Sequence, residues 1–338
     1  MNFRFLLFVS LIVIAFSACK KEEKRDLLTE RIEYDVTIDN EDSMEPWMNN
    51  VSPGERMTFL EFLFNQLSAG NATDSMGVKV DEASVKNMLM ALDSNLQFGE
   101  AKLFEYVRNE QIEVQMLRFR EKWTYNPETF SIYKQVQAVA PGVCLRDSDN
   151  VIRQIIPLFW VKCDTVDMEN PVLLSEFIIS DALVNNNTSA TMELYGESPY
   201  YLNNLDEPKR EKYFLDLKDQ VTSHKIKSYD YFFNDMAVKD VEAFIDHMDT
   251  LWVPDSLGKL IPYEYEVKML PQDFTRLKFA EKWEYSTDPF VIEKHVMGVN
   301  PSMYVTDDFG EFQGYRPMYW VVFNDEDLKI IRSKVKIY

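Results

Sequence analysis

The chain has 338 residues, of which 46% are hydrophobic and 14% aromatic, so it is long enough for two domains with real cores. Its formal net charge of −20, from 36 basic and 56 acidic residues, excludes nucleic acid as a partner because the phosphate backbone would repel it. The same charge opposes adsorption to anionic lipid head groups, so membrane attachment would need a separate anchor.

Residues 1–18 are predicted to be a bacterial lipoprotein signal peptide. A short basic start is followed by an apolar run at residues 5–16, which is too short to span a bilayer comfortably, and by small residues before Cys19. Cys19 is therefore the predicted lipidation site, where each buried methylene of an acyl chain would contribute about 0.8 kcal/mol. The alternative is an ordinary signal followed by an unmodified cysteine. The charged stretch 19–30 is predicted to be a polar tether.

Two amphipathic helices are predicted after a lead-in strand, and both recur later in the chain. Their apolar residues repeat at the spacing of one helical face. The predicted helices cover residues 55–68 and 82–96, and then 208–222 and 238–250.

An internal repeat organises the β-rich part of the sequence. A gapless alignment of residues 117–161 with residues 277–321 gives 16 identities in 45 positions, where chance would give roughly two or three. Because helices precede strands in each half, without βαβ alternation, the sequence predicts an α+β fold. We expect two tandem homologous domains, each with two helices followed by an antiparallel β-hairpin and further strands. The predicted repeats are residues 31–165 and 166–338, with the boundary in the region 165–198.

Both repeats contain a predicted β-hairpin with a glutamate on an otherwise aromatic face. The hairpins cover residues 119–136 and 279–296. With a four-residue loop in each hairpin, Glu121 would oppose Lys134, and Glu281 would oppose Lys294. These four residues are therefore predicted to form structural ion pairs. A catalytic carboxylate would need a further catalytic partner nearby, and the sequence offers none.

An aromatic cluster follows a proline after each hairpin. The two segments are Pro157-Leu158-Phe159-Trp160 and Pro317-Met318-Tyr319-Trp320. Such clusters are typical of a core. The alternative is a docking surface, for which the candidate aromatics are Phe159, Trp160, Tyr319 and Trp320.

The sequence contains no recognisable catalytic or metal-binding motif. Its three histidines, His224, His247 and His295, are far apart and lack ligand spacing, and there is no G-x-S-x-G, Walker or G-x-G-x-x-G motif. We therefore predict no catalytic residues, no metal and no cofactor. The sequence leaves two alternatives for Cys144 and Cys163, which either form a disulfide or are two buried thiols.

Three elements carry a family resemblance in the first half: Glu121-Lys122-Trp123, Pro141 and Pro157-Leu158-Phe159-Trp160. With these elements and their counterparts in the second half, each half resembles the GldN/PorN family of gliding-motility and type IX secretion proteins of Bacteroidota. The resemblance covers residues 46–164 and 199–324. It implies a periplasmic, non-enzymatic component that joins a lipoprotein in a ring beneath the outer membrane. Family members carry one copy and an ordinary signal peptide. This chain departs from that pattern in its two copies and its predicted lipid anchor, which suits a tethered relative with a different partner.

The predicted function is a non-enzymatic, lipid-anchored scaffold or adaptor of the cell envelope. Its expected partner is another envelope protein, for which the resemblance suggests a ring-forming lipoprotein, and its acyl chains would hold it in the outer membrane. The resemblance favours the periplasmic side, whereas Lys20-Lys21-Glu22-Glu23 resembles signals for export to the cell surface. One alternative function is a surface lipoprotein that binds glycan or peptide in a cleft between the domains. The other alternative is a hydrolase.

Overall fold

The computed structural model describes residues 24–39, 51–146, 152–184, 205–254, 256–270, 273–306 and 312–335. The predicted signal peptide and Cys19, the predicted lipidation site, lie outside these residues. Among the helices that are described, none combines the length and the apolar composition needed to cross a bilayer.

The protein is a mixed α+β structure with antiparallel strand pairing, which confirms the predicted class. Its helices are α2 (Pro53–Ser68), α3 (Glu82–Leu92), α4 (Leu103–Arg108), α6 (Glu207–Thr222), α7 (Val238–Ile245) and α8 (Asp325–Lys334). The long strands are β1 (Asp26–Thr37), β3 (Met116–Tyr125), β4 (Ile132–Arg146), β7 (Val172–Leu183), β12 (Phe274–Thr287) and β13 (Phe290–Thr306). Shorter strands are β2 (Ala72–Thr73), β5 (Ile152–Pro157), β6 (Trp160–Lys162), β8 (Ser228–Tyr229), β9 (Asp235–Met236), β10 (Asp246–Pro254), β11 (Leu260–Lys268), β14 (Phe312–Pro317) and β15 (Val321–Val322).

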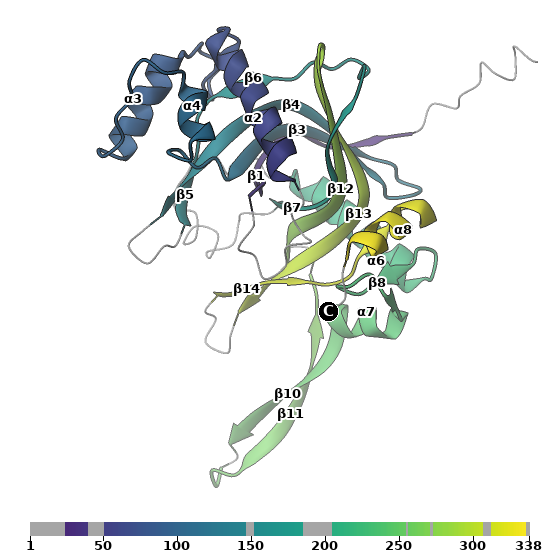
Figure 1. Cartoon of the computed structure of the whole chain (residues 1–338). Helices are drawn as coiled ribbons and strands as arrows, with labels where there is room; N and C mark the ends of the chain where they lie inside the picture. The colour runs from purple at the N-terminus through teal and green to yellow at the C-terminus, as the bar shows by residue number, and fades with distance from the viewer. Residues whose placement is uncertain are drawn as a thin grey trace, which may run out of the picture.

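Eleven of the described strands form one sheet, whose main path runs β1-β3-β4-β13-β12-β7. The hairpins β3–β4 and β12–β13 are joined edge to edge through β4 and β13, as Figure 1 shows. At this seam Lys134 lies opposite Lys294, and Gln135 lies opposite Glu293. Residues 31–165 and 166–338 therefore share one sheet.

The pairing on one side of the seam matches the pairing on the other. Strand β1 pairs with β3 so that Ile32 lies opposite Glu121, and β7 pairs with β12 so that Ile178 lies opposite Glu281. Each hairpin also has a β-bulge immediately before its glutamate, where the ladder register shifts after Arg120 and after Ala280. A bulge bends the strand and increases its local twist. The two hairpins therefore bend at the same place.

The first helix of each half packs on the hairpin of the other half. Phe59 of α2 lies edge-on to Tyr285 of β12, with ring centroids 4.9 Å apart. Tyr213 of α6 lies edge-on to Tyr125 of β3 at 5.1 Å, and its hydroxyl donates to the carbonyl oxygen of Phe130 at 3.2 Å. One cluster of buried apolar residues consequently includes side chains from both halves.

Local sequence explains where the helices begin and which face they bury. The carboxylate of Asp81 accepts a hydrogen bond from the amide of Ser84 at 2.8 Å and so caps α3, and Asn324 caps α8 through the amide of Asp327. On α2 the buried residues follow the three-to-four spacing of one helical face. They are Phe59, Leu60, Leu63, Phe64 and Leu67.

Several predicted boundaries are wrong. Strand β1 begins at Asp26, inside the predicted tether 19–30, because apolar residues such as the fully buried Leu28 extend the strand into it. Strand β7 lies within the predicted boundary region 165–198 for the same reason. The helix predicted at 238–250 ends at Ile245, and the chain continues into β10, whose β-forming residues are Thr250, Trp252 and Val253. The helix predicted at 82–96 ends at Leu92.

Candidate functional site

The four residues predicted to form ion pairs lie at the seam, with fully buried side chains. The ammonium of Lys134 lies 2.6 Å from a carboxylate oxygen of Glu281, and the ammonium of Lys294 lies 2.7 Å from Glu121. Both ion pairs therefore cross from one hairpin to the other. The predicted partners, Glu121 with Lys134 and Glu281 with Lys294, are wrong, although all four residues are paired.

The partners differ because both hairpin registers are shifted by two residues. Trp123 lies opposite Lys134, and Trp283 lies opposite Lys294. In the first hairpin the loop is longer than predicted, since the Asn126 side chain accepts hydrogen bonds from the amides of Glu128 and Thr129 and holds a wider turn. A shift of two keeps every side chain on its predicted face. Glutamates and lysines therefore still meet in the interior.

Aromatic side chains surround the crossed ion pairs. The Lys134 ammonium lies 3.1 Å from the ring centroid of Phe279, and the Lys294 ammonium lies 3.1 Å from that of Phe119. Both are cation–π contacts. Each glutamate also accepts a hydrogen bond from the indole two residues further along its own strand, from Trp123 at 2.7 Å and from Trp283 at 2.9 Å. A carboxylate on an aromatic face is thus compensated by the lysine of the other hairpin.

Tyr34 of β1 lies at the centre of this cluster and breaks its symmetry. Its hydroxyl donates to Glu121 at 2.9 Å and lies 3.1 Å from the ammonium groups of both Lys134 and Lys294. The corresponding position in β7 is Ser180, whose hydroxyl donates to Glu281 at 2.8 Å. Tyr34 therefore links both halves, and the hairpin sequences alone gave no signal for it.

The electrostatics of the cluster suit packing. Burial opposes ionisation of Glu121, but Lys294 and Lys134 outweigh it and hold the pKa of this carboxyl below its usual value. Burial lowers the pKa of Lys134 to about 8, against the attraction of Glu281 and Glu121. Burial also raises the pKa of Tyr34. Since the four ion-paired side chains have no solvent-exposed surface and Tyr34 is buried, a substrate has no access to them in this conformation.

The four candidate docking aromatics belong to the core. Phe159, Trp160, Tyr319 and Trp320 are only 1–3% exposed, which confirms the core interpretation and contradicts the docking alternative. Their segments are held by short strand contacts, with Trp160 opposite Thr73 and with Trp320 opposite Tyr229. The prolines end the preceding strands and turn the aromatic residues inward.

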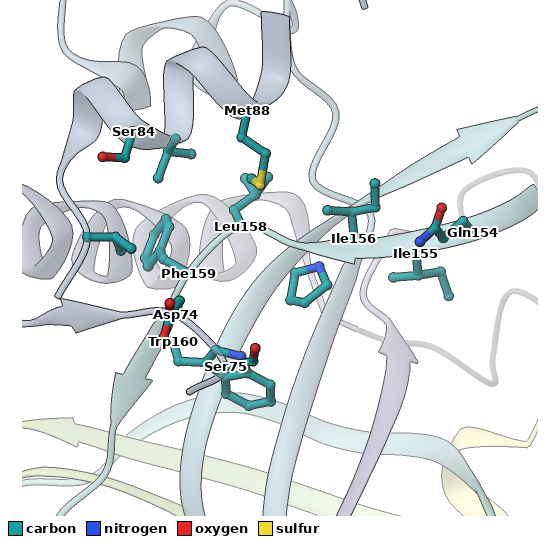
Figure 2. Close-up of a pocket in the computed structure, with 13 residues that line it drawn as sticks. Asp74, Ser75, Ser84, Met88, Gln154, Ile155, Ile156, Leu158, Phe159 and Trp160 are labelled. Atoms are coloured by element: carbon teal, nitrogen blue, oxygen red, sulfur yellow. The ribbon is translucent and has the colours of Figure 1, made fainter. Parts of the chain in front are cut away.

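A cavity of about 260 Å³ lies between α3, the end of β5 and the segment before β6. Figure 2 shows Met88 extending from α3 toward the segment that carries Leu158 and Phe159. The carboxylate of Asp74 at its rim accepts hydrogen bonds from the amides of Met76 and Val78, so it serves its own turn. The cavity can hold a small apolar group, but its lining offers no pair of acids for catalysis.

A similar pocket of about 310 Å³ occurs in the second half, next to α7 and β14. Asp230 at its rim accepts hydrogen bonds from the amides of Phe232 and Asn234, in the same pattern as Asp74. Phe244 and Met318 occupy the places of Met88 and Leu158. The cavity recurs in both halves, but its lining residues differ. We therefore interpret it as a consequence of the fold and not as a dedicated ligand site.

A polar depression of about 690 Å³ crosses the seam on the face opposite the ion pairs. Because side chains alternate along strands, Tyr133 and Gln135 of β4 and Glu293 and His295 of β13 face this depression while the lysines face inward. The guanidinium of Arg25 lies 3.6 Å from the Tyr133 ring centroid. Among the described residues, this depression is the feature that corresponds to the cleft predicted between the two domains.

The hairpin β10–β11, called the arm below (residues 246–268), projects away from the rest of the molecule (Figure 1). Its exposed large apolar residues, at 38–91% exposure, are Met248, Leu251, Trp252, Leu257, Leu260, Ile261, Tyr263 and Tyr265. The sequence prediction missed the arm because Met248 fits the helical stripe of α7. A usable signal was present, since the turn residues Asp255-Ser256-Leu257-Gly258 separate two runs of β-forming residues.

The two described cysteines and His295 have contacts that fit a structural role. Cys144 and Cys163 are free thiols, and burial raises the pKa of Cys163. The Nε2 atom of His295 lies 2.9 Å from a carboxylate oxygen of Asp327, so it connects β13 to α8. Among the described residues, no three or more His, Cys, Asp or Glu side chains are grouped as metal ligands would be.

The arm and the seam depression are thus the surfaces in the described ranges that present distinctive side chains to a partner. The predicted ion pairs and aromatics are used within the fold. Comparison with known proteins finds no family model that matches this chain, and no curated protein that matches it.

Proposed function

We propose that this protein is a non-enzymatic, lipid-anchored scaffold or adaptor of the cell envelope that binds another envelope protein. The exposed apolar surface of the arm carries the proposal. Soluble monomers rarely expose contiguous apolar patches larger than a few hundred Å², and larger ones mark interaction sites. Trp252 and Tyr263 are residue types that dominate binding energy at protein interfaces.

The absence of an enzymatic role is part of the same proposal. The two glutamates and the two lysines that the hairpins bury at the seam are compensated by one another inside the core. The carboxylates at the rims of the two apolar cavities, Asp74 and Asp230, accept hydrogen bonds from backbone amides of their own turns. Neither arrangement combines a solvent-accessible nucleophile with a base, which hydrolysis would require.

We further propose that the chain arose by duplication of one GldN/PorN-like unit. The 16 identities in 45 positions support this, as do the matching bulges beside Glu121 and Glu281. Strands β1 and β7 add to it, because Leu27-Leu28 and Leu173-Leu174 occupy equivalent positions relative to the two hairpins. The unit would sit at the outer membrane, held by acyl chains on Cys19 and facing the periplasm.

Purification of the natively anchored protein in mild detergent tests the adaptor function. We expect a second envelope protein to co-purify at fixed stoichiometry, measured by quantitative mass spectrometry. The variant Cys19→Ala should leave the membrane fraction, which checks the anchor separately. A protein that purifies alone at every detergent and salt concentration would contradict the proposal.

The second candidate is a surface lipoprotein that binds glycan or peptide in the seam depression. The polar lining and the ring of Tyr133 favour it, because an aromatic face beside hydrogen-bonding groups suits a sugar ring. Titration of defined oligosaccharides into the wild type and into Tyr133→Ala decides the question. This proposal would replace the adaptor function if the protein purifies alone, binds an oligosaccharide, and loses that binding in Tyr133→Ala.

A further inference from the structure

The outer part of the arm has one apolar face. Opposed residues on this face are Leu251 with Tyr263 and Val253 with Ile261. Two residues further toward the base, Tyr265 lies opposite Asp249, where the apolar face ends. Leu251, Ile261, Tyr263 and Tyr265 are each at least 38% exposed. A two-stranded hairpin with an uncovered apolar face has little stability of its own in water, so this face is suited to being covered.

The other face changes character along its length. Near the tip, Trp252 lies opposite Pro262, and Pro254 lies opposite Leu260. Near the base, Met248 lies opposite Glu266, and Thr250 lies opposite Glu264. The tip is therefore apolar on both faces, whereas the base has carboxylates beside the apolar face.

The strand edges of the arm are poorly suited to adding another strand. Pro262 lies within β11 and Pro254 ends β10, and proline has no amide hydrogen to donate to a new ladder. Proline and charged residues on an edge are a known way to prevent edge-to-edge pairing. Recognition through the side chains of the tip fits this sequence better than β-strand addition.

Charge limits what can cover the arm. Residues 246–268 contain five acidic and two basic residues, and the whole chain has a net charge of −20. A second copy of this chain and an anionic lipid surface would both be repelled. A protein groove with lysine or arginine at its rim would gain attraction from the base of the arm.

We infer that the tip of the arm inserts into an apolar groove of a partner protein, and that lysine or arginine side chains of that partner contact the acidic base of the arm. This inference rests on the proposed adaptor function and adds the binding element and the chemistry of its partner. Trp252 and Tyr263 are the anchor residues. Glu264 and Glu266 supply the charge complementarity.

Photo-crosslinking from the tip tests the inference in the full, natively anchored chain. p-Benzoylphenylalanine in place of Tyr263 should crosslink to one envelope protein, at a segment that forms an apolar groove flanked by lysine or arginine. Crosslinks confined to lipid, to a second copy of the chain, or to a surface without basic residues would overturn it.

Affinity measurements with that purified protein provide the second part of the test. Trp252→Glu should weaken binding by roughly thirtyfold, as expected for an interface hot spot. Glu264→Gln with Glu266→Gln should lower the affinity and reduce its dependence on salt. Leu215→Glu, at a position on α6 that is 41% exposed, is the matched control and should bind as the wild type does.

The two proposals fail in different ways. All three variants should melt at the wild-type temperature, because the arm residues that they change lie outside the buried clusters and Leu215 is exposed. If a stoichiometric partner still binds Trp252→Glu with unchanged affinity, the arm inference is wrong and the adaptor function stands. If the wild type itself has no protein partner, the adaptor function is wrong, and the arm inference with it.

Discussion

The two halves differ most in the segment between the second helix and the hairpin. In the first half, residues 93–115 fold back and include α4, where Leu103, Phe104 and Val107 are only 0–6% exposed. Phe104 lies 5.8 Å from Phe64 of α2, between ring centroids. In the second half, the same place in the order of elements is occupied by the arm, which projects into solvent (Figure 1).

We infer from this difference that the first segment serves stability and that the arm serves recognition. The first segment uses its apolar residues to extend the core beneath α2, whereas the arm keeps comparable residues exposed. Residues shared by the halves maintain the sheet and the crossed ion pairs. Binding specificity should therefore reside where the halves differ.

Truncation of one aromatic residue in each segment gives the largest expected contrast. Phe104→Ala should lower the free energy of unfolding by about 3–5 kcal/mol, because it leaves a cavity in the core. Trp252→Ala should change it by less than about 0.5 kcal/mol, because its side chain is 60% exposed. Urea denaturation followed by circular dichroism measures both. Similar losses from the two substitutions would mean that the arm is part of the core.

Removal of one lysine from the seam tests whether the ion pairs hold the halves together. Lys134→Ala leaves the buried carboxylate of Glu281 without its ammonium partner, at a cost of about 3–5 kcal/mol. Lys212→Ala removes an exposed pair with Asp216 and should cost at most about 1 kcal/mol.

A double-mutant cycle distinguishes the crossed partners from the partners predicted within each hairpin. Lys134 should couple more strongly to Glu281 than to Glu121 when each glutamate is replaced by glutamine in the Lys134→Met background. Stronger coupling between Lys134 and Glu121 would restore the prediction made from the sequence.

Local patterns in the sequence predicted the hairpins and the inward side of Glu121 and Lys134, because strand alternation depends only on neighbouring residues. The crossed partners depend on pairing between β4 and β13, whose Lys134 and Lys294 are far apart in the chain, and no local pattern encodes that contact. The position of Tyr34 could not be predicted for the same reason, because Tyr34 reaches the cluster from β1 and not from either hairpin. The arm was missed because an amphipathic strand and the end of a helix can share the same few apolar residues.

A glycine in the second half provides a smaller test of how closely the halves correspond. A Cβ atom on Gly298 would lie 2.8 Å from the carbonyl oxygen of Val321, whereas the equivalent Ala138 in β4 is accommodated opposite Lys162. Gly298→Ala should therefore destabilise the protein by about 1–3 kcal/mol through overpacking. Thermal unfolding of this variant and of Ala138→Gly compares the two sites. An unchanged melting temperature for Gly298→Ala would show that β15 can move aside.

The smallest expected effect concerns α8, which packs against β13, β7 and β15. The hydrogen bond to Asp327 raises the pKa of His295 above its usual value, with Lys282 opposing and Glu284 assisting the shift. Because the native pKa exceeds the unfolded one, this contact stabilises the fold fully below about pH 6.5 and loses its effect as the pH rises through the native pKa. The His295 side chain is 55% exposed, so screening should keep the contribution below about 1 kcal/mol.

Stability measured at pH 5.5 and pH 8.5 should differ less in His295→Gln than in the wild type. Gln135 occupies the equivalent position in β4, so glutamine is compatible with the strand there. Hydrogen exchange at the amides of α8 should rise with pH beyond its intrinsic dependence in the wild type alone. The same excess in both proteins would mean that another group governs the docking of α8 on β13.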